Sequence, residues 1–337
     1  MEPLVVTMGE PAGIGGEIVL SAFARAKARL PAFAMIGDAT WLATLNQRLG
    51  LSVPLKTISA PAEAVRVFET ALPVLQQDLA VAVEPGRPDA RNAPAVIAAI
   101  DRAVDWCLSG AARAMVTGPI HKAVLYAAGF EAPGHTEYLA LRIAARTGKR
   151  PVPIMMLVIP GLRVVPVTVH LSLADAIGAL SSTLIVETAR QVAGALRQDF
   201  GIAVPKLVIA ALNPHAGEDG ALGREERDIV APAVATLQRE GITVRGPLPA
   251  DTLFHAAARA AYDAALCLYH DQALIPLKTI DFEHGVNVTL GLPFVRTSPD
   301  HGTAFDIAGQ GRASPESFIA ACALAAEIAK ARTRRRP

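Results

Sequence analysis

Short apolar runs alternate along nearly the whole chain with longer stretches in which apolar residues recur at helical spacing. The apolar runs predict strands at residues 4–8, 33–36, 114–117, 154–159, 163–169, 206–212 and 264–269. The periodic stretches predict helices at residues 17–29, 93–108, 136–146, 183–200, 224–240 and 315–331. Because strands and helices alternate, the pattern predicts an α/β fold with a mainly parallel sheet. Because the strands are almost entirely apolar, we expect helices on both faces of that sheet.

The composition is that of a chain able to bury a large core. Of its 337 residues, 52% are hydrophobic and 19% are charged, a balance that excludes an intrinsically disordered protein. No internal repeat with a period of about 20 to 50 residues and no low-complexity linker divides the chain. We therefore expect one two-lobed unit over residues 1–337, with a cleft for the active site. The lobes are expected to be discontinuous, with residues 1–118 and 275–337 in one and residues 119–274 in the other.

The charge balance bears on the partners of the protein. Lys and Arg total 32 and Asp and Glu total 31, which leaves a net charge of +1. A protein that tracks the phosphates of a nucleic acid is normally far more basic, so we expect no nucleic-acid partner. The most apolar run, residues 152–162, is interrupted by Pro153, Pro160 and Gly161. Since about 20 apolar residues are needed to span a bilayer, we expect no membrane partner either.

The cysteines and the first residues indicate where the protein works. Cys107, Cys267 and Cys322 lie far apart, each within an apolar segment. This pattern predicts buried thiols in a reducing compartment and argues against a disulfide framework. Glu2 stands where a secretory signal peptide would carry positive charge. We therefore expect a cytoplasmic protein.

Three histidines share one local setting. His170, His215 and His270 each come at or just after the end of an apolar run that is expected to be a buried strand. Open parallel sheets bind ligands outside the carboxyl ends of their strands, and three imidazoles there could hold a divalent cation with positions left for a substrate. Asp271, beside His270, could be a further ligand or could orient that imidazole. The alternative is that each histidine is an ordinary hydrogen-bonded residue at a strand end.

A second set of residues has the chemistry of an anion site. Thr136 precedes a periodic stretch and is expected to cap a helix, whose first backbone N–H groups attract anions. Lys278, Asn287 and Arg296 add charge and directed donors in a region with few other cations, as a bound phosphate requires. Each has a plainer explanation, which is a simple helix cap for Thr136 and ordinary surface charge for Lys278 and Arg296.

A glycine-rich segment, residues 9–16 with the sequence GEPAGIGG, follows the first predicted strand and opens the first predicted helix. It matches neither the G-x-G-x-x-G pattern of dinucleotide-binding turns nor the Gly-Lys-Ser/Thr of a phosphate-binding loop. Two interpretations stay open: a tight turn beside a ligand, or a turn with a structural role alone.

Eight segments, in order along the chain, carry a resemblance to a known family: GEPAGIG (9–15), VTGPIHK (116–122), GHTEYL (134–139), VTVHLSL (167–173), LNPHAGE (212–218), GPLPADTLF (246–254), YHDQ (269–272) and GVNVTLGLPFVRTSPDHGTAFDIAG (285–309). Through them almost the whole chain is similar to the 4-hydroxythreonine-4-phosphate dehydrogenases, a family of vitamin B6 (pyridoxal phosphate) biosynthesis. The family's fold is similar to that of the isocitrate and isopropylmalate dehydrogenases. The resemblance therefore implies a two-lobed α/β fold with an active-site cleft and without the G-x-G-x-x-G turn.

The resemblance also implies an activity. The family oxidises the hydroxyl group of 4-phosphooxy-L-threonine with NAD⁺, and the β-keto acid formed loses CO₂ to give 3-amino-2-oxopropyl phosphate, a step of pyridoxine 5′-phosphate biosynthesis. Each active site uses one divalent metal ion, for which zinc, cobalt and magnesium are candidates, and the cofactor is NAD or NADP. Family members are homodimers whose active sites draw on both subunits. By resemblance, this chain is an oxidoreductase that acts on a small phosphorylated substrate.

Residue by residue, the resemblance assigns roles within these segments. The implied metal ligands are His170, His215 and His270, and the implied substrate contacts are His135, Thr136, Lys278, Asn287 and Arg296. In the related dehydrogenases a segment like residues 301–309 holds the adenosine end of NAD, which suggests Gly302, Thr303 and Asp306 as cofactor residues. Lys122 and Asp251 are both candidates for moving a proton, and the sequence does not choose between them.

Three other functions stay open. The nearest is a paralogous dehydrogenase that oxidises another phosphorylated hydroxy acid, such as 4-phospho-D-erythronate. A metal-dependent hydrolase would use the three histidines and a bound water, and it would turn over without NAD⁺. A binding protein would hold the phosphorylated ligand and turn nothing over. Assays with both substrates, with and without NAD⁺, distinguish these functions.

Overall fold

The computed structural model describes residues 2–132 and 134–334, and the chain divides into two compact units. Unit 1 comprises Met1–Pro153 and Leu292–Lys330, and unit 2 comprises Ile154–Gly291 and Ala331–Pro337. The lobe boundaries expected from the sequence lie at other residues, and that division of the chain stays a prediction.

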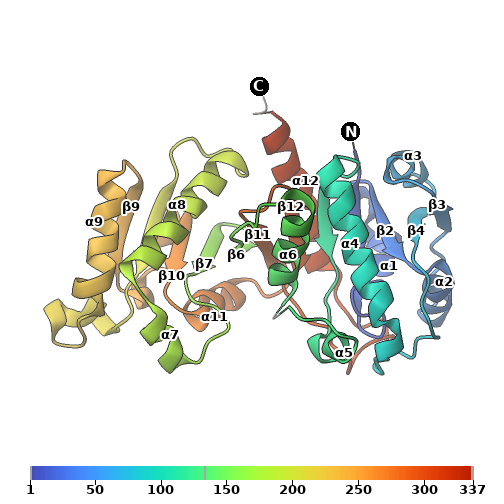
Figure 1. The fold of residues 1–337 in the computed structure, drawn as a ribbon, viewed down its shortest axis with the longest axis horizontal. Coiled ribbons are helices and arrows are strands. Elements are labelled where there is room, and N and C mark those ends of the chain that lie inside the picture. Colours follow the sequence, from blue (N-terminus) through green and yellow to red (C-terminus); the bar gives the residue numbers. More distant parts are fainter. Residues whose placement is uncertain (1, 133, 335–337) are drawn as a thin grey trace. The chain divides into compact units, whose positions relative to one another are not determined.

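Unit 1 is built on a parallel sheet (Figure 1). Its strands lie in the order β3-β4-β2-β1-β5-β12, and every neighbouring pair is parallel. The strands are β1 (Leu4–Thr7), β2 (Phe33–Gly37), β3 (Leu55–Ile58), β4 (Leu72–Gln76), β5 (Ala114–Thr117) and β12 (Val295–Pro299). The helices are α1 (Gly15–Ala26), α2 (Ala39–Arg48), α3 (Ala64–Val67), α4 (Ala93–Ser109), α5 (Lys122–Ala127), α6 (His135–Thr147) and α12 (Glu316–Thr333), with short turns at Lys27–Arg29, Pro61–Glu63 and Ala90–Asn92.

The local sequence explains why these elements form. All residues of β1, LVVT, are buried, as expected for a central strand covered on both faces. In α4 the buried residues Val96, Ala99, Ile100 and Ala103 recur at spacings of three and four, so one stripe of the helix faces the sheet. The helix ends at Gly110, whose φ of 80° is one that glycine adopts without strain.

Unit 2 is built on a mixed sheet with the strand order β11-β6-β7-β10-β8-β9. The strands β7, β10, β8 and β9 are parallel, and β6 runs antiparallel to both β7 and β11. The strands are β6 (Ile154–Ile159), β7 (Leu162–Pro166), β8 (Lys206–Ala210), β9 (Thr243–Leu248), β10 (Ala264–Cys267) and β11 (Val286–Leu290). The helices are α7 (Leu173–Ala179), α8 (Ser182–Gln198), α9 (Ala231–Arg239), α10 (Ala256–Arg259) and α11 (His270–Ile280), with short turns at Pro214–Gly220, Glu226–Val230 and Ala250–Thr252.

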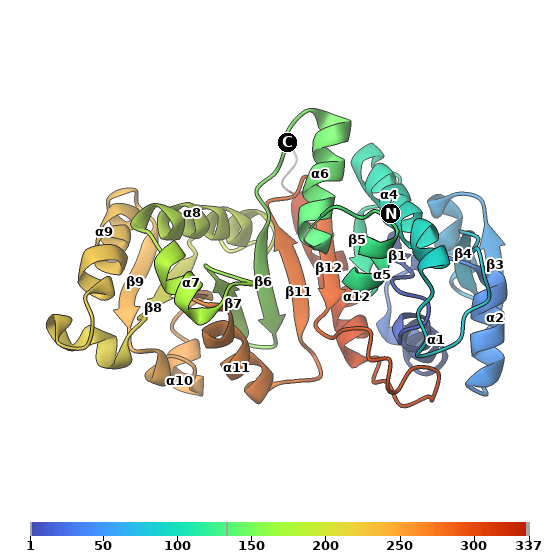
Figure 2. The same cartoon turned by 60° about the horizontal axis from the view of Figure 1, so that its bottom comes forward.

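Helices cover both faces of the unit 2 sheet. Figure 2 shows α8 and α9 on one side of the strands and α10 and α11 on the other. On the α11 side, Ala273 and Leu277 pack against Val164, Val208 and Cys267 of the strands in one core cluster. The arrangement leaves α11 beside the ends of β7 and β10, where the candidate site lies.

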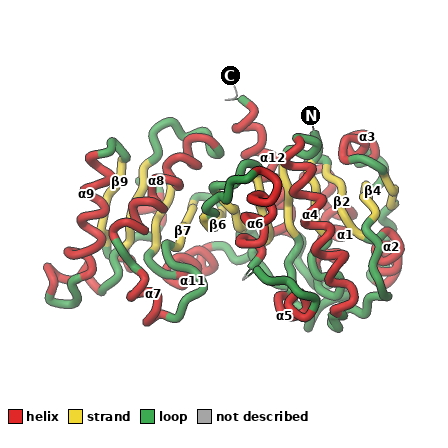
Figure 3. Tube along the Cα trace, in the orientation of Figure 1, coloured by secondary structure: helices red, strands yellow, loops and turns green. Residues whose placement is uncertain are grey.

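The sequence predicts this α/β fold correctly, and every predicted strand and helix is present (Figure 3). Strands that the apolar pattern does not predict include β3 and β9, and several of their residues are exposed. The three cysteines are buried free thiols, as predicted. Among the described residues, no helix combines the length and the apolar character needed to cross a bilayer.

Candidate active site

Three neighbouring strand ends of unit 2 carry the three predicted metal ligands. The strands β7, β10 and β8 are adjacent and parallel, so their carboxyl ends lie at one edge of the sheet. His170 follows β7, His215 follows β8, and His270 follows β10 as the first residue of α11. The strand-end setting inferred from the sequence is therefore present in the fold.

His170 and His270 lie next to each other. Their ring centroids are 6.1 Å apart, and both line a hollow of about 250 Å³. His270 Nδ1 is 2.7 Å from Asp271 Oδ1, and this contact leaves Nε2 available to a ligand. An imidazole held by a carboxylate in this way is the usual donor to zinc and similar cations. The donor chemistry of the pair therefore fits a divalent metal ion.

His215 is not grouped with this pair. It lies in the turn Pro214–Gly220, where its φ is 52° and the neighbouring residues also adopt left-handed backbone conformations. Within residues 2–132 and 134–334, no three His, Cys, Asp or Glu side chains come close enough together to hold a metal ion. The structure thus brings two of the three predicted ligands together and places the third on a neighbouring strand end.

Two predicted substrate residues also belong to unit 2. Lys278 lines a hollow of about 440 Å³ together with His270 and Asp271, and its ammonium group lies 5.6 Å from the centre of the Phe282 ring. Asn287 lies on β11, and its Oδ1 is buried without a hydrogen-bond partner among the described residues. A buried amide oxygen without a partner is costly, so Asn287 has an unused acceptor to offer a ligand.

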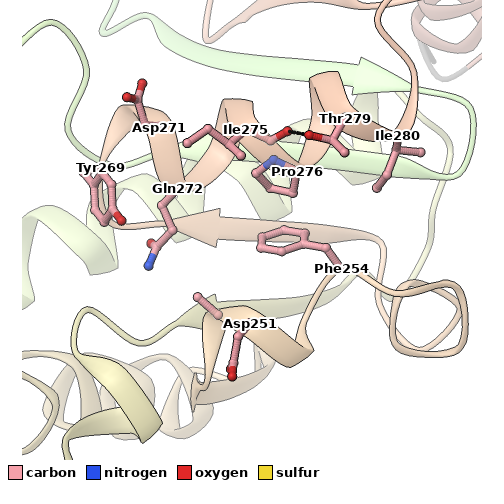
Figure 4. A pocket seen from close by; sticks show the side chains of 10 residues that line it. Asp251, Phe254, Tyr269, Asp271, Gln272, Ile275, Pro276, Thr279 and Ile280 are labelled. Carbon is pink, nitrogen blue, oxygen red and sulfur yellow. Dashed lines mark hydrogen bonds between the residues drawn. The ribbon is translucent and has the colours of Figure 1, made fainter.

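Asp251 lines an adjoining cavity of about 510 Å³ in unit 2. Figure 4 shows Asp251 across this cavity from α11, with Phe254 between the two sides. Tyr269 and Asp271, which flank His270 in the chain, line the same cavity. The candidate proton-transfer residue Asp251 therefore shares this cavity with residues at the start of α11.

Arg296, the other predicted substrate cation, is buried inside unit 1. Only 4% of the residue is exposed, and its Nε and Nη2 donate to Thr117 Oγ1 at 3.1 and 2.7 Å. Burial lowers the pKa of Arg296 to about 10, an effect that the carboxylate of Glu137 partly opposes. Ordinary surface charge, the plainer explanation of Arg296, is therefore wrong. The sequence does not single out Thr117, although a polar residue that ends an apolar strand is a signal that could have found it.

The start of α6 lies close to Arg296. The helix begins at His135 with Gly134 at the capping position, so the prediction that Thr136 caps it is wrong, and Thr136 lies in the first turn. His135 Nε2 is buried and has no hydrogen-bond partner among the described residues. A Cβ placed on Gly134 would lie 3.5 Å from Lys122 Nζ, so Lys122 is adjacent to the same turn.

We expect His135 to make the folded protein sensitive to mild acid. Burial, and then the charge of Arg296, lower the pKa of His135 well below its ordinary value of 6.5. Below that value the unfolded chain binds a proton at His135 and the folded protein does not, so stability falls as pH falls. Denaturant unfolding at about pH 7.5 and 5.5 should show that wild type loses more stability than His135→Gln. An equal loss in both proteins would contradict this prediction.

The predicted cofactor residues lie in one loop of unit 1, after β12. Gly302 and Asp306 are exposed, whereas the Thr303 carbonyl accepts a hydrogen bond from the backbone N–H of Ile14 at 3.0 Å. The buried carboxylate of Glu17 in α1 accepts from the N–H groups of Gly309 at 2.7 Å and Ala313 at 3.1 Å. These contacts hold the loop at Thr303, Gly309 and Ala313.

The glycine-rich segment, residues 9–16, supports this arrangement. Gly9 has a φ of 66°, and a Cβ there would lie 2.5 Å from the Pro119 carbonyl oxygen. A Cβ on Gly13 would lie 2.9 Å from the carbonyl oxygen of Thr303. Both glycines are needed because two other backbone segments approach too closely for a side chain. Of the two interpretations, the structural role therefore has direct support.

Comparison with known proteins gives matches over nearly the whole chain. The profile of the family described as "Pyridoxal phosphate biosynthetic protein PdxA" matches residues 29–325. A 4-hydroxythreonine-4-phosphate dehydrogenase from Bradyrhizobium diazoefficiens is 54% identical over 341 residues, covering 98% of each chain. The crystal structure of the 4-hydroxythreonine-4-phosphate dehydrogenase from Klebsiella pneumoniae has a TM-score of 0.85 at 37% identity, covering 98% of this chain and 100% of that one.

A more distant solved structure has the same fold and a different named substrate. The terephthalate 1,2-cis-dihydrodiol dehydrogenase from Burkholderia xenovorans LB400 is 28% identical, with a TM-score of 0.62, and the match covers 96% of this chain and 97% of that one. Its name contains no phosphorylated substrate.

Proposed function

Because this chain belongs to the PdxA family of pyridoxal phosphate biosynthetic proteins, we propose that it is an NAD-dependent 4-hydroxythreonine-4-phosphate dehydrogenase. It oxidises 4-phosphooxy-L-threonine and releases CO₂ and 3-amino-2-oxopropyl phosphate. The observation that carries the proposal is the 54% identity to a protein of that name over 98% of both chains. The buried guanidinium of Arg296 supports it, because a phosphorylated substrate needs fixed cationic donors.

Arg296 and its neighbours are proposed to bind the substrate phosphate. The guanidinium is fixed by Thr117 before any ligand arrives, so the side chain loses little conformational entropy when a dianion binds. His135 and Thr136 lie in the first turn of α6, where unpaired backbone N–H groups favour an anion. In unit 2, Lys278 offers a second cation and Asn287 an amide, and we assign both to the substrate.

The metal site is proposed to consist of His170, His215 and His270, with Asp271 holding the His270 ring through Nδ1. Zinc, cobalt and magnesium are the candidate ions. When bound, such an ion lowers the pKa of the substrate hydroxyl and stabilises the negative charge that develops as CO₂ leaves. The residues' own task is to present neutral imidazoles at one edge of the sheet.

The remaining assignments concern the cofactor and the proton. We propose that Gly302, Thr303 and Asp306 bind NAD or NADP. Glu17 keeps their loop in place through its two backbone hydrogen bonds. Lys122 and Asp251 are the proposed proton-transfer residues; Lys122 lies beside the turn that carries His135.

We also propose that the enzyme is a cytoplasmic homodimer with shared active sites. Large apolar side chains are exposed on and around α7 and α11 of unit 2, namely Leu171, Leu173, Ile177, Ile275, Ile280 and Phe282. Ile275 and Phe282 are 63% and 74% exposed, and apolar side chains gathered in this way mark an interaction surface. Sedimentation should give twice the mass of the chain.

The proposed reaction predicts a simple assay result. Purified protein should convert NAD⁺ to NADH with 4-phosphooxy-L-threonine, and a chelator should abolish the signal until a divalent metal is restored. The same assay with 4-phospho-D-erythronate tests the paralogous activity. Faster turnover of the phosphoerythronate would replace the proposed substrate, and product formation without NAD⁺ would indicate the hydrolase.

A further inference from the structure

A buried polar side chain joins two of the strand ends that carry the proposed metal ligands. Gln272, in the first turn of α11, is only 8% exposed. Its Oε1 accepts from the backbone N–H of Leu268 at 2.7 Å, and its Nε2 donates to the carbonyl of Ala211 at 2.7 Å. Leu268 lies just past β10 and Ala211 just past β8. The carboxamide therefore links these strands at the point where their own ladder of hydrogen bonds ends.

Thr168 extends the connection to the third strand end. Its Oγ1 donates to the carbonyl of Leu268 at 2.8 Å, and its backbone N–H donates to the same oxygen at 3.3 Å. The peptide groups of Leu268 are thus held from both sides, by Thr168 and by Gln272. Thr168 and Leu268 each stand two residues before a proposed ligand, His170 and His270 respectively.

The segment that leads to His215 is held by the buried carboxylate of Glu226. Oε1 accepts from the N–H groups of Leu212 at 2.8 Å and Asn213 at 2.7 Å, and Oε2 accepts from Asn213 Nδ2 at 2.9 Å. Burial alone would raise the pKa of Glu226, but these hydrogen bonds outweigh it and hold the pKa below its ordinary value. The carboxylate therefore stays charged and holds its donors, the N–H groups of Leu212 and Asn213, in place.

The turn beyond Asn213 is strained. His215, Ala216, Glu218 and Asp219 all have positive φ values between 40 and 55°, a region that residues other than glycine rarely adopt. Such conformations persist only where the surroundings impose them, and they gather at functional sites. Here Glu226 is the neighbouring anchor, because a Cβ on Gly217 would lie 2.6 Å from its Oε2.

We propose that Gln272, Thr168 and Glu226 are positioning residues of the metal site. They fix the strand ends from which the three imidazoles reach the ion, and none of them is itself a ligand. The inference rests on the metal dependence of the proposed function. Groups that hydrogen-bond a metal ligand directly change metal affinity about 10- to 100-fold when they are removed. We expect the lower end of that range for residues that hold the backbone next to the ligands, because ligands that are held in advance lose less freedom on binding.

Thr168→Val tests the network with a matched control, Thr297→Val. Each substitution keeps the side-chain shape and removes one buried hydrogen bond to a backbone carbonyl, at 2.8 Å to Leu268 for Thr168 and at 2.9 Å to Ala321 for Thr297. The metal-free full-length variants are titrated with Co²⁺, which is followed by its visible absorption, and urea unfolding gives their stability. We expect Thr168→Val to bind Co²⁺ about 10-fold or more weakly and Thr297→Val to bind it like wild type, although both lose similar stability.

A second variant removes the central residue. Gln272→Met keeps a side chain of similar length but leaves the N–H of Leu268 and the carbonyl of Ala211 without their partner, so its Co²⁺ affinity should fall further than that of Thr168→Val. Weakening confined to these two variants supports the positioning role. If Thr168→Val and Gln272→Met bind Co²⁺ like wild type, or if Thr297→Val is weakened equally, the positioning role is wrong. The proposed metal site itself is unaffected by either result. A wild-type protein that binds no Co²⁺ overturns the proposed metal dependence and this inference with it.

Discussion

Replacing His170, His215 or His270 with alanine is expected to abolish turnover and to empty the metal site while the fold is retained. The three side chains follow neighbouring parallel strands, and the rings of His170 and His270 are already adjacent, with centroids 6.1 Å apart. Loss of one imidazole leaves a divalent ion with two protein ligands, fewer than the three that catalytic zinc sites normally have. Activity should therefore fall to background in each variant.

Metal content and folding must be measured together with activity. His255→Ala is the matched control, because His255 is an exposed histidine of the same unit that lies at the start of α10. Elemental analysis of the purified proteins should show metal in wild type and in His255→Ala, and little in the three site variants, with circular dichroism unchanged. Full metal occupancy in all three site variants would contradict the ligand assignment.

The same variants test whether active sites are shared between subunits. Two inactive chains that lack different ligands can form mixed dimers, and one complete site is restored only where the missing ligands come from different subunits. We expect at least one pairing among His170→Ala, His215→Ala and His270→Ala to recover activity. No recovery in any mixed dimer confirmed by mass would show that each site is built within one chain.

The sequence predicts the fold and the strand-end histidines because both depend on short-range patterns. A buried strand such as β1 is apolar throughout, and a helix such as α4 shows its buried stripe in the spacing of its own residues. Parallel strands present their carboxyl ends at one edge of the sheet. A polar residue that follows an apolar strand can therefore be located at that edge without knowledge of any distant contact. His170 and His270 are located by this reasoning alone.

Other features depend on contacts between distant parts of the chain, and no local pattern contains them. Arginine is normally exposed, and Arg296 is buried through its hydrogen bonds to Thr117, 179 positions away. The left-handed turn at His215 depends on Glu226, whose carboxylate reaches back to Leu212 and Asn213. For Arg296 the plainer interpretation of the sequence is surface charge, and for His215 it is an ordinary residue at a strand end.

Substituting Arg296 with alanine is expected to weaken binding of the phosphorylated substrate far more than binding of NAD⁺. Arg296 is 4% exposed, and its guanidinium is fixed by two hydrogen bonds to Thr117 Oγ1, so it meets a phosphate dianion with its geometry set in advance. Removing one member of a desolvated charge pair costs about 2 to 5 kcal/mol, or roughly 30-fold to several-thousand-fold in affinity. Arg296→Lys should recover only part of this loss, because an ammonium group cannot reproduce a planar, bidentate contact.

The comparison that decides this assignment is between two binding constants in the same set of variants. Arg102→Ala is the control in unit 1, because Arg102 is a partly buried arginine that donates to the Gln76 carbonyl at 2.6 Å, at the end of β4. Arg102→Ala should leave the dissociation constant for the substrate near that of wild type. Substitutions of Thr303 and Asp306 should raise the dissociation constant for NAD⁺ more than that for the substrate. If Arg296→Ala instead bound substrate like wild type and raised the NAD⁺ constant, Arg296 would belong to the cofactor site. The phosphate would then have to be held by other donors, of which Lys278 in unit 2 is the next to test.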